Sequence, residues 1–225
     1  MFILGATGSP SLAFPNAYID TDEPPKRSLV RTALCALSVA GVGYLGSVIL
    51  ALSLFWTQYS PISQFASDYG VGAFGPEMNA GFFLAGAGVV SLALVAPSGP
   101  GSNHRAAAFL LFLDGLCLVA SAFFQTDIEG AAATFHGGVH NFAGVVFFIT
   151  SPVAVMLLGR RFGSRWFFIA LAAVAGAVAF VVANGVLGLG ATGLAERMVI
   201  LVVFSGLILT SVRLLSDPGP LRPGS

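Results

Sequence analysis

Residues 166–187 read WFFIALAAVAGAVAFVVANGVL, a run of 22 residues without a charged side chain. A helix needs about 20 consecutive, mainly apolar residues to cross the hydrocarbon core of a bilayer. The apolar residues are continuous and do not alternate with polar ones. The run therefore predicts a membrane-spanning helix and excludes a strand of a membrane barrel.

Five further runs of similar length lie along the chain, and we expect each to form a spanning helix. They cover about residues 29–55, 78–97, 106–126, 137–158 and 195–214. The composition agrees, because 56% of the residues are hydrophobic and only 9% are charged. The sequence therefore predicts an all-α polytopic membrane protein, a bundle of six transmembrane helices. It excludes a soluble enzyme, a disordered tail and a nucleic-acid-binding protein.

The basic residues are sorted between the two ends of this predicted bundle. Arg197 falls on one face, and the other nine Lys and Arg residues fall on the opposite face. By the positive-inside rule, both termini are expected to be cytoplasmic. We expect an irregular leader over residues 1–28, the transmembrane domain over 29–214 and a C-terminal tail over 215–225.

Polar residues gather on the predicted outer face, where they form a candidate site. Ionisable groups at membrane depth are costly, so they indicate functional positions. The residues of this outer group are Asp68, Asn79, Asp127, His136, His140, Asn141, Glu196 and Arg197.

His136 and His140 stand four residues apart at the start of the fourth span, so they share one helix face. The spacing can bring two imidazoles to one metal ion, with a carboxylate such as Asp127 or Glu196 as third ligand. In a structural alternative, the histidines hydrogen-bond to neighbouring carboxylates and hold helices together. A third possibility is the binding of a proton or a ligand. The cofactor that this pair of histidines could bind is a metal ion. Nothing in the sequence specifically indicates haem or a pigment.

Two further ionisable positions have alternatives of their own. Arg197 is expected to form an internal ion pair with Asp68 or Asp127, or to bind an anion or a lipid headgroup. Asp114 lies near the middle of the third span, where a carboxyl group must face the bundle or be protonated. It would act either as a proton relay or as a neutral group that hydrogen-bonds to a neighbouring helix.

Three motifs resemble the family named domain of unknown function 998, over about residues 30–214. They are SDYG at 67–70 followed by NAGF at 79–82, FQTD at 124–127 followed by HGGVHN at 136–141, and GLAER at 193–197. A proline usually stands where this chain has Gln125. The resemblance implies a six-span, prokaryotic protein of the inner membrane and supplies no reaction.

A weaker likeness joins the His136–His140 pair to membrane hydrolases of the alkaline ceramidase and adiponectin receptor type. Those sites hold one zinc ion with three histidines, whereas this chain has two histidines on the outer face. The sequence favours a non-catalytic role: an accessory or packing subunit of a larger membrane complex, or a bundle that binds a lipid or cofactor. The alternative is a metal-assisted hydrolase of an outer-leaflet lipid, with Glu196 or Asp68 as base. Expected partners are membrane lipids and other membrane subunits, not nucleic acid.

Overall fold

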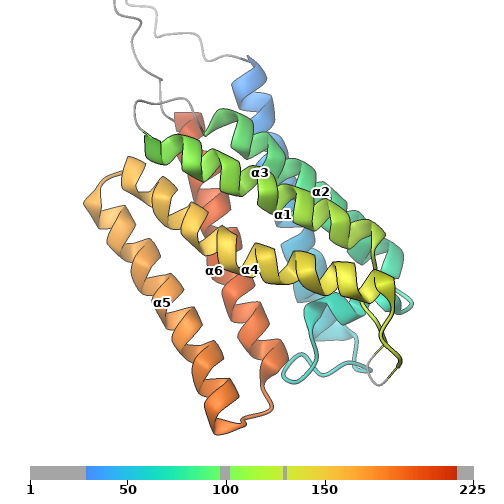
Figure 1. Cartoon of the computed structure of the whole chain (residues 1–225). Helices are drawn as coiled ribbons and strands as arrows, with labels where there is room; N and C mark the ends of the chain where they lie inside the picture. The colour runs from blue at the N-terminus through green and yellow to red at the C-terminus, as the bar shows by residue number, and fades with distance from the viewer. Residues whose placement is uncertain (1–28, 97–101, 129–130, 217–225) are drawn as a thin grey trace, which may run out of the picture.

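The computed structural model describes residues 29–96, 102–128 and 131–216 (Figure 1). These residues contain six long helices, one short 3-10 helix and no strand. The elements are α1 (Leu29–Phe55), η1 (Ala66–Val71), α2 (Gly75–Val95), α3 (Ser102–Phe123), α4 (Phe135–Arg161), α5 (Ser164–Leu187) and α6 (Thr192–Ser216). The predicted leader over residues 1–28, residues 217–225 of the predicted tail and Glu129 lie outside the described residues.

The six long helices confirm the predicted all-α, six-span architecture, since each is long and apolar enough to cross a membrane. Several helices begin before the predicted spans. For example, α2 begins at Gly75 rather than at residue 78, with Pro76 in its first turn. Hydropathy marks the part of a helix that lies in hydrocarbon, whereas the helix itself continues into the polar interface. Five of the six long helices therefore begin ahead of the apolar runs, whereas α2 and α3 end before them, at Val95 and Phe123.

Consecutive long helices run antiparallel, and each packs against the next along the chain (Figure 1). Because α6 also packs against α1, the helices close into a ring. The outermost helix is α5, whose buried residues are Val174, Ala177 and Asn184. We call the end that carries η1 and the first turns of α2, α4 and α6 the outer end. Described arginines at the opposite end are Arg31, Arg105, Arg160, Arg165 and Arg213, as the charge pattern predicts.

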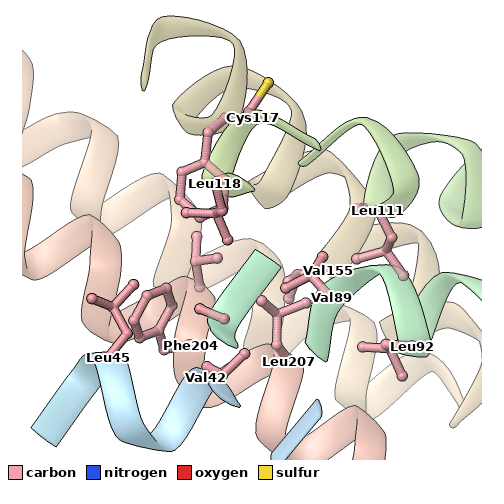
Figure 2. Close-up of a cluster of buried hydrophobic side chains, with 14 of the residues drawn as sticks. Val42, Leu45, Val89, Leu92, Leu111, Cys117, Leu118, Val155, Phe204 and Leu207 are labelled. Carbon is pink, nitrogen blue, oxygen red and sulfur yellow. The ribbon is translucent and has the colours of Figure 1, made fainter. Parts of the chain in front are cut away.

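The core of the bundle lies between α1, α2, α3, α4 and α6. Figure 2 shows Val42 of α1, Val89 of α2 and Leu207 of α6 meeting there, and each is at most 1% exposed. Lipid chains are as apolar as these side chains. Association of the helices therefore depends on close packing more than on burial.

Glycines allow the backbones of α1, α2 and α3 to approach one another. A Cβ atom on Gly41 of α1 would overlap the carbonyl group of Leu84 on α2. A Cβ on Gly86 of α2 would lie 2.7 Å from the carbonyl oxygen of Gly115 on α3. A Cβ on Gly115 would lie 2.8 Å from the carbonyl oxygen of Gly86. Small residues at these points are thus required for the observed helix separation.

A pair of glycine substitutions on one helix tests this packing. Gly41→Ala should lower the free energy of unfolding by about 1–3 kcal/mol, because the added methyl group forces α1 away from α2. Gly43→Ala is the matched control, since nothing lies within 4 Å of its Cβ position. Its stability should be unchanged or slightly higher, as alanine favours helix more than glycine does. Equal stability of both variants in denaturant unfolding would contradict the packing account.

Candidate functional site

The loop that follows α1 is fastened to the first turn of α6. The backbone N–H of Leu194 donates to the carbonyl oxygen of Ile62 at 2.9 Å, and the Thr192 hydroxyl donates to that of Ser63 at 2.6 Å. Gly193 leaves room for this contact, because a Cβ there would overlap the carbonyl group of Gln64. Gly193, the glycine of the GLAER motif, is therefore needed for the loop to approach α6 this closely.

Arg197 connects three parts of the outer end. Its Nε donates to Ser53 Oγ of α1 at 3.1 Å. Its Nη1 donates to the carbonyl oxygens of Gln64 at 2.8 Å and Gly193 at 3.0 Å. Its Nη2 donates to the hydroxyl of Tyr69 in η1 at 3.3 Å, and the guanidinium carbon lies 5.5 Å from the centre of that ring. The guanidinium group therefore holds α1, the loop and η1 against α6.

These four hydrogen bonds of Arg197 all go to neutral oxygens. The ion pair with Asp68 or Asp127 stays a prediction. Asp68 accepts a hydrogen bond at 3.0 Å from the backbone N–H of Phe65, which precedes η1. Its carboxylate thus stabilises the start of the 3-10 helix. The partners of Arg197 are uncharged, so the pattern of charged residues in the sequence could not predict them.

Asp127 organises the start of α4. Its carboxylate accepts the hydroxyl of Thr134 at 2.6 Å and the backbone N–H of the same residue at 3.1 Å. The Thr134 hydroxyl in turn accepts the backbone N–H of Gly137 at 3.1 Å, as an N-cap residue does. A Cβ on Gly137 would overlap the Asp127 carboxylate. The motifs FQTD and HGGVHN therefore meet in one helix cap.

The same cap sets the charge of Asp127. The hydroxyl and the backbone N–H of Thr134 both donate to the charged form. They hold the pKa of Asp127 below its ordinary value. Each oxygen of the Asp127 carboxylate thus accepts one hydrogen bond from Thr134.

The two histidines occupy different environments. His140 is 7% exposed, and its Nδ1 lies 2.8 Å from the carbonyl oxygen of Phe124. Because a carbonyl can only accept, Nδ1 carries the hydrogen. His136 is exposed and lies against the Phe124 ring, with 5.3 Å between ring centroids.

The metal hypothesis for His136, His140 and Asp127 finds no support in these positions. Within residues 29–96, 102–128 and 131–216, no group of three or more His, Cys, Asp or Glu side chains is placed to hold a metal ion. His136 and His140 contact Phe124, and Asp127 accepts hydrogen bonds from Thr134. The metal triad therefore stays a prediction on which we build no function.

A cavity of about 550 Å³ opens between η1, α1, α2, α3, α4 and α6, and we call it the outer cavity. Most of its wall is apolar. Figure 2 shows two of its wall residues, Leu45 and Phe204, side by side. The polar residues of its wall are Ser67, Ser121, Thr126, His140, Asn141 and Glu196. Three residues of the predicted outer group, His140, Asn141 and Glu196, are thus brought to one cavity.

Glu196 marks the boundary of the outer cavity. Its Oε2 accepts a hydrogen bond at 2.5 Å from the backbone N–H of Ala66, the first residue of η1. A second, nearly apolar cavity of about 470 Å³ lies between α4, α5 and α6. Glu196, Phe65 and Phe148 line both cavities. The half-buried carboxyl group therefore stands where two apolar spaces meet.

The remaining residues of the candidate site do not line the outer cavity. Asn79 is half-buried against η1, with its Oδ1 3.3 Å from the position that a Cβ on Gly70 would take. Asp114 is buried farther along the bundle and contacts the Thr150 hydroxyl of α4. The sequence interpretation missed Thr134, although a threonine before an apolar helical run is a typical N-cap. It also missed Ser53, which had no distinguishing pattern, and Tyr69, which lies in the SDYG motif but was given no role.

A family model described as "Protein of unknown function (DUF998)" matches residues 38–213. The match includes the SDYG, FQTD, HGGVHN and GLAER motifs and confirms the predicted resemblance. No curated protein and no solved structure matches the chain.

The cap of α4 predicts a pH dependence of stability. A carboxyl group with a lowered pKa stabilises the fold above the pKa of the unfolded chain. That contribution is lost as the pH falls through the folded-state pKa. Thermal unfolding of the wild type should therefore shift to lower temperature on acidification by more than unfolding of Asp127→Asn.

The control for this prediction is Glu77→Gln, which replaces an exposed carboxyl group in the first turn of α2. Its melting temperature should follow the wild-type pH curve. An Asp127→Asn curve parallel to that of the wild type would show that the Thr134 bonds do not favour the charged carboxylate.

Proposed function

The chain belongs to the DUF998 family of proteins of unknown function, and we propose that it is a non-catalytic membrane component that binds one amphiphilic molecule in the outer cavity. The observation that carries this proposal is the combination of a mostly apolar wall with a few polar groups, His140, Asn141 and Glu196. The outer cavity has a volume of about 550 Å³, which falls within the range of small-molecule sites, about 300–1,000 Å³.

The polar groups favour a particular kind of headgroup. Neither lysine nor arginine is among the described residues that line the outer cavity. Glu196 presents a carboxyl group, and a neutral His140 with hydrogen on Nδ1 has an acceptor at Nε2. Such a wall favours a headgroup that donates hydrogen bonds, such as an alcohol or an amine. An anionic headgroup would lack a counter-charge there.

A lateral route supports binding from the membrane. Val145 and Ile149 line the outer cavity, and their side chains are 58% and 64% exposed. In a membrane, this exposed part of α4 faces lipid chains. The cavity wall thus reaches the lipid-facing surface, so an amphiphile of the adjoining leaflet has a path that avoids water.

The other expectations have less support. Metal-assisted hydrolysis needs His136, His140 and Asp127 around one ion, and Asp127 is instead bonded to Thr134. A role as an accessory subunit is compatible with amphiphile binding and would be tested by co-purification with defined partners. Cytoplasmic termini and a prokaryotic inner membrane stay predictions from the charge pattern and the family resemblance.

A cavity-filling substitution tests the proposed function. Gly144 lines the outer cavity, and nothing lies within 4 Å of its Cβ position. Gly144→Leu should therefore occupy the cavity without forcing helices apart. We expect it to weaken binding of a fluorescent long-chain alcohol by at least about tenfold, equivalent to roughly 1.4 kcal/mol. The measurement is a titration of the protein in lipid nanodiscs.

Gly138→Leu is the matched control on the same helix. Its Cβ position is also open, it is exposed, and it lines neither cavity. This variant should bind the alcohol as the wild type does, and a fatty acid of equal chain length should bind less tightly to both. Absence of saturable binding to the wild type, or equal loss in both leucine variants, would contradict the proposal.

A further inference from the structure

Asp114 is a buried acid without a nearby basic group. It is 1% exposed on α3, which packs against α2 and α4. On α3 itself, Arg105 is nine residues away, roughly 13.5 Å along the helix. Other ionisable groups described on the three helices are His104 and Cys117 of α3, Glu77 of α2, and His136, His140 and Arg160 of α4. Only Cys117 lies within one turn of Asp114 along α3, and a thiol supplies no positive charge.

The Thr150 hydroxyl indicates which group carries the hydrogen. Its oxygen lies 2.8 Å from the carbonyl oxygen of Val146 and also contacts Asp114 Oδ1. A hydroxyl donates one hydrogen, and a carbonyl oxygen can only accept. When Thr150 donates this hydrogen to Val146, its contact with Asp114 is satisfied if Asp114 supplies the second hydrogen.

The other oxygen of Asp114 leads to the same result. Asp114 Oδ2 and Ser151 Oγ are both buried and have no hydrogen-bond partner. A charged carboxylate with one unbonded oxygen in hydrocarbon is far more costly than a neutral acid with one unbonded oxygen. Both observations disfavour the anion.

We infer that Asp114 and Thr150 form a proton-binding site in the interior of the bundle, where Asp114 is a neutral acid that donates a hydrogen bond from α3 to Thr150 of α4. The site adjoins the outer cavity, since Cys117 and Leu118 of that cavity follow Asp114 by about one helical turn. It does not depend on amphiphile binding, because its evidence is the contact between the two helices.

Infrared spectroscopy of the purified full-length protein tests the inference directly. A protonated carboxyl group has a C=O stretching band that a carboxylate lacks, and isotope-labelled aspartate distinguishes it from glutamate. At neutral pH, the wild type should show this aspartic acid band, and Asp114→Asn should remove it. Asp127→Asn is the control and should leave the band unchanged. A wild-type spectrum in which Asp114→Asn removes only carboxylate bands would overturn the inference.

A second variant covers the case in which Asp114→Asn does not fold. Thr150→Val keeps the shape of the side chain and removes the hydrogen-bond acceptor. The C=O band of Asp114 should then move to higher frequency, because its O–H group has lost its partner. Thr150→Ser retains the acceptor and should keep the wild-type frequency. An identical band in all three proteins would show that Asp114 does not donate to Thr150.

Discussion

A hydrocarbon interior offers no hydrogen-bond partners, so a polar atom that enters it must find one within the protein. The long helices meet this constraint for the backbone, and several buried hydroxyls meet it through nearby oxygens. Ser121 donates to the carbonyl oxygen four residues earlier in its helix. Ser211 of α6 lies 3.0 Å from Ser38 of α1 and joins two helices. Asp114 and Thr150 satisfy the same constraint between α3 and α4.

At the outer end, two charged residues form a structural framework. Arg197 and Asp127 use their hydrogen-bonding groups to hold a loop, a 3-10 helix and a helix start in place. Gly137 and Gly193 provide the space for these contacts. The family motifs therefore describe how the outer end is built. The space that remains inside this framework, lined by His140 and Glu196, is the part of the outer end suited to a ligand.

The sequence predicted the fold well because membrane spans depend on local composition. A run such as residues 166–187 forms a helix in a bilayer whatever its neighbours are, because only a helix satisfies all its backbone hydrogen bonds within the run. The hydrogen-bond partners of the outer residues, in contrast, depend on which helices pack together in the folded chain. The pair His136 and His140 shares a helix face, yet one histidine is exposed and the other is buried behind Phe124. Arg197 donates hydrogen bonds to Ser53 and Tyr69, two partners that the charge pattern did not predict. Spacing along the sequence carries no information about such contacts.

Amphiphile binding in the outer cavity can be measured by native mass spectrometry of the intact protein, released gently from its membrane. We expect one bound amphiphile per chain, without a net negative charge on its headgroup and removable by excess long-chain alcohol. A chain that carries no such molecule and does not take up the alcohol would overturn the proposed function. So would one that carries a metal ion lost on substitution of His136 or His140.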